Sequence, residues 1–248
     1  NVGFGTGWDD PTVTSLTIPF PFNFNGTFYS SCKVTGNGFI TFGTTAPATN
    51  EYNPISSTVG YAGAVSAFGR DLINNGVDVT YTTSGTTPNR VFIVQWNNAR
   101  RYSGSARNGN HNFQIRLSEA TNIVQIVYNS ATSTYATNIP VQIGLRGAAN
   151  TDYNNRTSAT NFSSTTAGGS NSATVITKNT AALNPTAGLT FTWTPPTASY
   201  RVYYYDMNIG STNWCAGETR NVTVSLKNTG TATWTNSGPD INIGCKWN

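Results

Sequence analysis

Charge is the property that this sequence has least of. Only 10% of its 248 residues are Asp, Glu, Lys or Arg, whereas an average soluble protein has roughly 25%. The net charge is +4, and the basic residues are scattered along the chain. Because nucleic-acid binding needs a dense basic surface, this composition argues against a nucleic-acid partner.

Residues that commonly carry catalysis or bind metals are also scarce. The chain has one histidine and three cysteines. No cysteine lies in a CxxC pair, so a zinc site is not expected. His111 would have to serve any Ser-His-Asp triad, but the sequence has no Gly-x-Ser-x-Gly elbow. Glu51 and Glu119 lie in predicted loops and do not suggest a glycosidase pair. We therefore interpret His111 as a structural or surface histidine and expect no enzyme.

What the chain does have is β-patterning. Short apolar-alternating runs are bounded by Gly, Asn, Pro or Ser, which predicts many short strands. Residues 16–24 alternate, but Pro19 and Pro21 predict that this run is an edge strand or an irregular one. Residues 113–128 form the clearest hairpin, with a turn at 120–122. A weaker strand is predicted near 174–177, and no apolar run is long enough to insert directly into a membrane.

These strands predict an all-β protein with two domains. Residues 1–197 are expected to form a large β-sandwich or jelly-roll-like domain that ends near Pro195 and Pro196. Residues 198–248 show the alternation of an immunoglobulin-like sandwich, yet they supply about half of the ~100 residues such a domain needs. We expect either that the protein continues, or that another chain completes this half domain by strand addition.

The cysteines and the low charge favour an extracellular or cell-surface setting. Cys215 opens the second domain, Cys245 lies on a predicted strand further along, and we predict that they form a disulfide. Such a bond adds about 3 kcal/mol or more in the chain-entropy account. Cys32 lies in a predicted strand and is expected to be a buried free thiol.

Calcium is the one cofactor that the sequence leaves open, because oxygen ligands do not need histidine. Asp71 and Asp78 are the pair that we favour. Asp9 and Asp10 are a second candidate, although the sequence before Pro11 is more typical of a turn.

Aromatic side chains are the candidates for a sugar-binding role, since rings stack on sugar faces in lectin-type sandwiches. Trp96 lies in an apolar strand and is expected in the core. In the run from Tyr203 to Tyr205, Tyr204 faces opposite to its neighbours, so one face of the run is expected to be buried between domains. The candidate platforms are Tyr102, Tyr153, Tyr203 and Tyr205.

Four segments carry a resemblance to a known family. The pieces "IPFPFNFNGTFYSSCKVTGNGFITFG", "AVSAFGRDL", "RVFIVQWNNARRY" and "HNFQIRLSEATNIVQIVY" resemble nidogen-like (NIDO-type) modules. With "GLTFTWTPP", the run is similar to N-terminal modules of large secreted proteins of the Bacteroidetes group, which commonly leave the cell by the type IX route. The resemblance implies architecture rather than catalysis. Relatives often carry an aromatic and an acidic pair where this chain has Arg70 beside Asp71.

The sequence after the Pro-Pro pair resembles a different kind of module. The signature Asn-Thr-Gly-Thr-Ala-Thr-Trp at 228–234 is similar to Ig-like repeats, which serve as stalks in bacterial surface proteins. The leading hypothesis is a non-catalytic surface adhesin or structural module of a larger secreted bacterial protein. The alternatives are a carbohydrate-binding module attached to a degradative enzyme, and a subunit of an extracellular filament or complex. Other protein chains or surface glycans are the expected partners.

The disulfide is testable by counting thiols. Under denaturing conditions, alkylation without reduction should modify one of the three cysteines, Cys32, and alkylation after reduction should modify all three. Mass spectrometry of the alkylated chain gives the count. Three modified thiols without reduction would contradict the Cys215–Cys245 bond.

Overall fold

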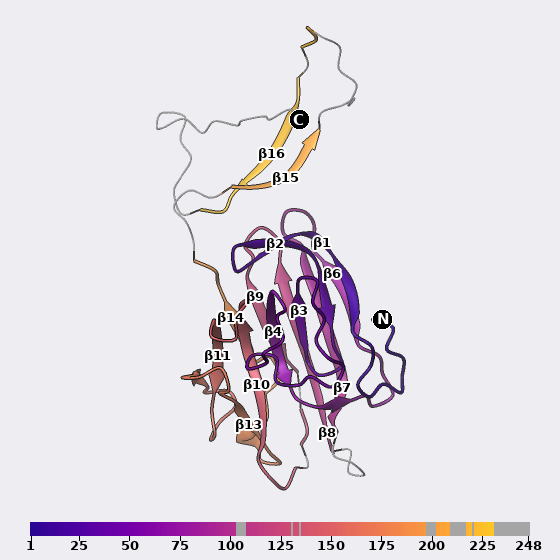
Figure 1. Ribbon diagram of the computed structural model, residues 1–248, viewed down its shortest axis with the longest axis vertical. Coiled ribbons are helices and arrows are strands. Elements are labelled where there is room, and N and C mark those ends of the chain that lie inside the picture. The colour runs from indigo at the N-terminus through magenta and orange to yellow at the C-terminus, as the bar shows by residue number, and fades with distance from the viewer. Residues whose placement is uncertain are drawn as a thin grey trace.

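The chain folds almost wholly into antiparallel strands in the computed structural model (Figure 1). The structure describes residues 1–102, 108–129, 131–133, 135–196, 202–208, 217–219 and 221–230. Two sheets lie face to face and enclose one hydrophobic core. The all-β fold and the β-sandwich expected for the first domain are confirmed.

The first sheet has eight strands in the order β1-β2-β3-β4-β10-β11-β12, and β13 also pairs with β10. Its strands are β1 (Thr14–Phe24), β2 (Thr27–Val34), β3 (Phe39–Phe42), β4 (Gly63–Gly69), β10 (Ile139–Arg146), β11 (Tyr153–Thr157), β12 (Thr166–Ala167) and β13 (Val175–Thr177).

The second sheet has six strands in the order β14-β9-β8-β7-β5, and β6 also pairs with β7. Its strands are β5 (Leu72–Ile73), β6 (Thr80–Ser84), β7 (Val91–Arg101), β8 (Asn108–Ser118), β9 (Val124–Tyr128) and β14 (Thr190–Trp193). The single short helix among the described residues is the 3₁₀ turn η1 (Ala181–Leu183).

Strand β1 shows how the apolar alternation becomes a core face. Every second side chain from Leu16 to Phe24 is buried, and those between are exposed or half-buried. The strand forms one end of its sheet, as the two prolines predicted, because an edge strand does not need every N–H for pairing. Its pairing with β2 shifts register between Thr17 and Phe22, across the prolines.

Trp96 on β7 connects the two sheets. Its ring is fully buried and stacks on Phe113 of β8 at 5.2 Å. Its indole N–H donates to the carbonyls of Thr35, at 3.1 Å, and Gly36, at 3.2 Å, in the turn between β2 and β3. The polar edge of the largest core side chain is thereby satisfied across the sandwich, and the prediction that Trp96 is a core residue is confirmed.

The predicted turns also form where the sequence placed them. Ala120 and Asn122, between β8 and β9, both have positive φ, at 59° and 53°. The weak strand expected near 174–177 is β13. The polar stretch from 148 to 182 contains β11, β12 and β13, so it is not a structureless loop.

Most of the predicted second domain, residues 198–248, lies outside the described residues. The described part is an antiparallel pair of strands, β15 (Val202–Asn208) and β16 (Thr223–Asn228). In Figure 1 this pair lies beyond the end of the sandwich. Cys215 and Cys245 fall outside the described residues, so their disulfide stays a prediction.

Replacing Trp96 by Phe should destabilise the sandwich. The substitution leaves the carbonyls of Thr35 and Gly36 without their donor and opens a small cavity. We expect the free energy of unfolding to fall by about 2–4 kcal/mol. Urea denaturation followed by circular dichroism measures it. Tyr81→Phe, at an exposed ring on β6, is the control and should change little. Equal midpoints for Trp96→Phe and the wild type would contradict the assigned role.

Candidate functional site

A groove opens where the two sheets diverge beside β11 and β14. It has a volume of about 740 Å³. It is walled by the β1–β2 turn, the β10–β11 turn, the start of β9, and the segment that leaves β14. The lining residues are Asn23, Phe24, Asn25, Gly26, Asn122, Val124, Leu145, Arg146, Gly147, Asp152, Tyr153, Asn154, Trp193, Thr194, Pro195 and Pro196.

The β1–β2 turn places two asparagines at the groove. Phe24 pairs with Thr27, so the loop consists of Asn25 and Gly26, with φ of 49° and 83°. An Asn-Gly pair suits such a turn, because both central residues need positive φ. The Asn23 side chain accepts the backbone N–H of Gly26 at 3.2 Å. The turn is therefore held by its own side chains, which fixes the position of Asn25.

The β10–β11 turn meets this first turn through one hydrogen bond. The amide of Asn25 donates to the Asp152 carboxylate at 2.9 Å. Gly147 lies directly behind the pair, since a Cβ there would come within 1.9 Å of the Asp152 carboxylate and 2.6 Å of the Asn25 amide. Only glycine leaves room for this contact between two turns that are 127 positions apart in sequence.

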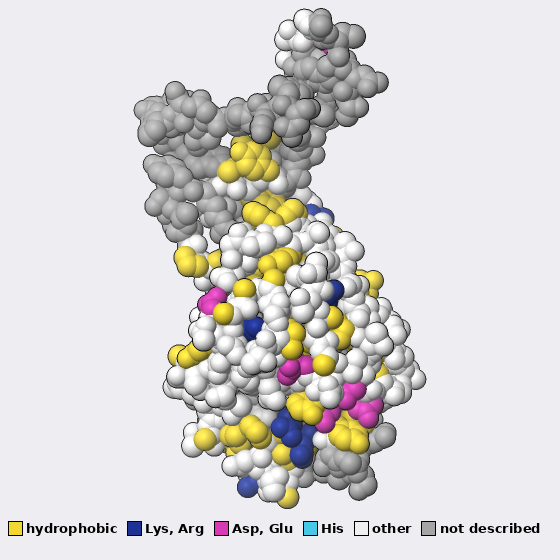
Figure 2. Space-filling model, in the orientation of Figure 1, with side chains coloured by type: hydrophobic (Ala, Val, Ile, Leu, Met, Phe, Trp, Pro, Cys, Tyr) yellow, Lys and Arg dark blue, Asp and Glu magenta, His cyan; other side chains and the backbone are white. Residues whose placement is uncertain are grey.

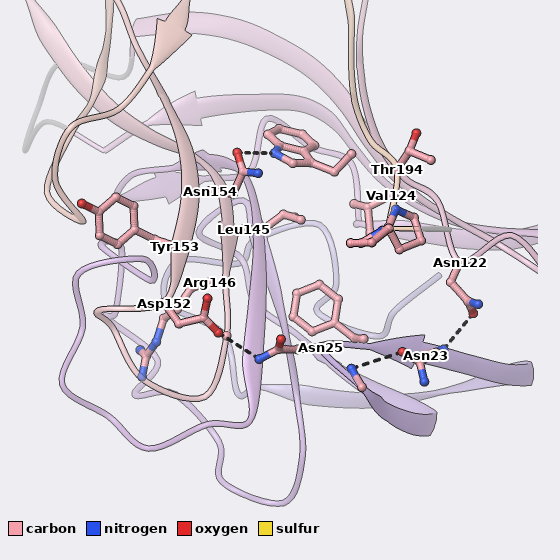
Figure 3. Close-up of a pocket in the computed structure, with 16 residues that line it drawn as sticks. Asn23, Asn25, Asn122, Val124, Leu145, Arg146, Asp152, Tyr153, Asn154 and Thr194 are labelled. Carbon is pink, nitrogen blue, oxygen red and sulfur yellow. Dashed lines mark hydrogen bonds between the residues drawn. The ribbon is translucent and has the colours of Figure 1, made fainter. Parts of the chain in front are cut away.

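Trp193 at the end of β14 forms the third side of the groove. Its indole N–H donates to the Asn154 side-chain oxygen at 3.0 Å, and its ring meets Phe191 edge-on at 6.4 Å. The side chain is half-buried against the core. In Figure 3, Leu145 lies in the middle, with Asn154 on one side of it and Asn23 and Asn25 on the other.

The basic side chain among the residues that line the groove, Arg146, is engaged by contacts within the domain. Arg146 is buried, and its guanidinium stacks over Tyr61 at 4.2 Å. It donates to the carbonyls of Ser57, Val59 and Ala148 at 2.9, 2.8 and 3.2 Å. Asp152, by contrast, is exposed. The groove thus presents amides, one carboxylate, the Thr194 hydroxyl and an indole to solvent. Figure 2 shows how sparse charge is on the visible face.

A smaller groove of about 390 Å³ continues along β14. It shares Asn154, Trp193 and Thr194 with the first. Its basic residue, Arg156, is also engaged: it donates to the Thr165 side chain at 2.8 Å and to the Thr165 carbonyl at 2.5 Å. The two grooves adjoin at Trp193 and Asn154, and we call them together the trough between β11 and β14.

A sequence model described as NIDO related matches residues 2–195. The chain belongs to the NIDO-related family. The match spans the whole sandwich, so the nidogen-like resemblance is confirmed, and this family indicates an extracellular structural or binding module. No curated protein and no solved structure matches the chain. None of the helices in the described parts of the chain is long and apolar enough to cross a membrane.

The four tyrosines expected as sugar platforms are spread over the NIDO-related domain and the hairpin that follows it. Tyr153 lines the groove, although its ring points away from Leu145 in Figure 3. Tyr102 is 38% exposed, and its backbone N–H bonds to the Asp71 carbonyl, away from the groove. The Tyr205 side chain lies outside the described residues.

Tyr203 is buried rather than displayed, with 7% of its surface exposed, whereas Tyr204 is 55% exposed. This is the alternation expected for the tyrosine run. The Tyr203 hydroxyl donates to Glu119 at 3.0 Å. Glu119 also pairs with the Arg90 guanidinium, with contacts of 2.6 and 2.8 Å. Burial raises the pKa of Tyr203 to about 12, and the hydrogen bond to Glu119 adds to that effect.

The candidate calcium residues are arranged differently from the expected pairing. Asp71 lies with Asp9 and Asp10, their carboxylate oxygens all within 4.8 Å of one another. The Asp78 carboxylate instead accepts the backbone N–H groups of Gly3 and Phe4, at 3.0 and 3.2 Å. Asp78 therefore holds the N-terminal segment in place. Calcium binding by Asp71 and Asp78 stays a prediction.

The single histidine and the cysteine of the NIDO-related domain are both buried. His111 is 1% exposed, its Nε2 lies 2.8 Å from the Tyr135 hydroxyl, and burial lowers its pKa to about 4. It is a neutral core residue, which is the structural one of the two expected roles. Cys32 is a free buried thiol, which was also expected, and burial raises its pKa to about 12. A thiol so rarely ionised is unreactive.

Sequence reasoning missed the residues that shape the groove, above all Asn25, Asp152, Asn154 and Trp193. The Asn-Gly dipeptide at 25–26 was a usable turn signal. Nothing local, however, indicates that this turn meets Asp152. The indole of Trp193 was visible only as part of the alternating run that ends the domain.

Asp71 should make the domain less stable at neutral pH than at acid pH. Burial, with Asp10 and Asp9 nearby, raises its pKa from 3.8 to about 6 despite Arg70 and Arg101. Because the folded-state pKa lies above the unfolded value, ionising Asp71 costs more in the folded chain. That penalty is absent below about pH 4 and complete above about pH 6.

We therefore expect Asp71→Asn to raise the Tm at pH 7.5, measured by thermal unfolding in EDTA so that no cation screens the cluster. The gain should shrink as the buffer is taken to pH 4.5. A gain of equal size at both pH values, or a lower Tm at pH 7.5, would contradict the raised pKa.

Proposed function

We propose that this chain is the non-catalytic head of an extracellular adhesin, part of a larger secreted bacterial protein. The proposal extends the family membership, which indicates a structural or binding module, to a specific role in attachment. Secretion by the type IX route of the Bacteroidetes group, and an Ig-like stalk after residue 197, belong to the same proposal.

The observation that carries the proposal is the character of the groove. Its exposed polar groups are amides, one carboxylate and the Thr194 hydroxyl, and a half-buried indole lies beside them. Amides and indoles form hydrogen bonds and apolar contacts but do not exchange protons near neutral pH. Such a surface is suited to holding a ligand unchanged.

Two of the groups that could transfer protons, His111 and Glu119, are committed to structural contacts. His111 is enclosed in the core and bonded to Tyr135. Glu119 is held by Arg90, whose hydrogen bonds lower the pKa of its carboxyl against the effect of burial. Both arrangements support a binding role for the domain over a hydrolytic one.

Contacts between the β15–β16 hairpin and the end of the sandwich support a role for the NIDO-related domain as the head of a larger protein. Tyr203 reaches Glu119, and the Lys227 ammonium donates to the Asn89 side chain at 2.6 Å. Both strands of the β15–β16 hairpin thus contact the end of the NIDO-related domain. A following unit that contacts the sandwich in this way would hold the groove in a fixed orientation relative to the rest of the protein.

The second candidate function is a carbohydrate-binding module attached to a degradative enzyme. The same groove favours it, because sugar sites combine an aromatic platform with amide and carboxylate partners. The two candidates share the binding step and differ in what the rest of the protein does.

Attachment can be measured with the full chain coupled to fluorescent beads. We expect saturable retention on at least one surface of a panel coated with polysaccharides, mucin or extracellular-matrix proteins, and unaltered ligand when the bound material is recovered and analysed by mass spectrometry. Beads blocked with albumin are the control. Retention on none of the surfaces, or a shortened ligand after incubation, would contradict a non-catalytic adhesin.

A further inference from the structure

We propose that the trough between β11 and β14 is a binding site for a neutral oligosaccharide. The inference rests on the proposed binding function and assigns to it a place and a class of ligand. The site is formed by Asn25, Asp152, Asn154 and Trp193, and Leu145 lies in its middle (Figure 3).

Two exposed side chains offer complementary hydrogen-bonding groups. Asn154 uses its oxygen to accept the Trp193 indole N–H, which leaves its amide Nδ2 as a donor. Asp152 accepts the Asn25 amide on one carboxylate oxygen, which leaves the other as an acceptor. Neither remaining atom has a partner among the described residues. Neighbouring hydroxyls of a sugar ring both donate and accept, so they match this pair.

The hydrogen bonds that these side chains already make also hold them in place. Asn25 fixes the Asp152 carboxylate, and Asn154 and Trp193 fix each other. A site whose side chains are ordered before binding loses less conformational entropy when the ligand arrives.

Trp193 supplies the apolar surface that a sugar ring requires. Its indole is half-buried and is held by Asn154 on its N–H edge and by Phe191, which meets it edge-on. The remaining surface of an ordered indole can pack against the C–H face of a pyranose. Leu145, also half-buried, adds apolar surface to the same groove.

The charges exposed in the trough favour a neutral ligand over an anionic one. The exposed ionic group of the trough is the Asp152 carboxylate, whereas Arg146 and Arg156 are engaged by carbonyls and a threonine. A sulfated or uronic-acid chain would meet a like charge with no available cation to offset it. A neutral glycan meets no such cost, and its hydroxyls can donate to the carboxylate.

The size of the trough favours several sugar units over one. The two grooves have volumes of about 740 and 390 Å³ and share Asn154, Trp193 and Thr194. A ligand that passes Trp193 therefore extends into both grooves. A single sugar would fill only part of this space, whereas an oligosaccharide could occupy both grooves.

The probe is an array of neutral oligosaccharides (glucans, mannans, galactans, xylans and N-acetylhexosamine oligomers) with sulfated and uronic-acid oligosaccharides and peptides printed beside them. We expect the full chain to bind at least one neutral series. Isothermal titration with the best binder should give an affinity that changes little between low and high salt, since no ion pair is involved.

Two groove variants and one control locate the site. Trp193→Ala should weaken binding about tenfold, as expected for loss of an aromatic contact. Asn154→Asp keeps an acceptor for the Trp193 N–H but removes the donor and adds charge, so it should weaken binding without lowering the Tm. Tyr81→Ala removes an exposed aromatic ring on β6 and should bind as the wild type does.

Four outcomes overturn the inference. Wild-type affinity in Asn154→Asp would place the sugar elsewhere and leave the adhesin proposal standing. Binding only to anionic glycans with steep salt dependence, or only to peptides, would also replace the ligand class while leaving attachment intact. Retention on no glycan, peptide or coated surface would remove both the inference and the proposed function.

Discussion

The hydrogen bonds of the Trp96 indole to the β2–β3 turn are the contact on which the sandwich depends most. A large aromatic core is stable only if its polar edge is satisfied, and here the partners come from the opposite sheet. The same layer contains Phe113 and Phe68, stacked at 5.6 Å, and the Tyr128 hydroxyl donates to the Ala67 carbonyl at 2.5 Å. These contacts hold the two sheets together in the middle of the core.

The trough lies where this core ends. The partners β9 and β10 are central to the packing, while β14 and β11 beside them lie at the periphery of the sandwich. Their side chains therefore reach solvent without leaving the rigid frame. Asp152 is positioned by its hydrogen bond to Asn25, and Trp193 by its hydrogen bond to Asn154 together with its packing against the core. A stable core with a neutral, ordered rim fits a domain that holds a ligand and leaves it chemically unchanged.

The sequence predicted what depends on local pattern. Alternation identified the buried face of β1, its prolines predicted the edge, and the apolar neighbours of Trp96 predicted its burial. What it could not predict depends on distant pairing. The fold places Asp71 beside the N-terminal aspartates, a neighbourhood that no local pattern indicates. The contact between Asn25 and Asp152 likewise joins two turns whose separate patterns carry no information about each other.

The most direct test of the binding trough follows the tryptophan side chains in solution. In a titration of the ¹⁵N-labelled chain with a neutral oligosaccharide, the indole N–H resonance of Trp193 should shift and saturate. The indole resonance of Trp96, buried in the core, should not move. Saturable shifts that leave Trp193 unchanged and appear instead on residues distant from β11 and β14 would contradict the account.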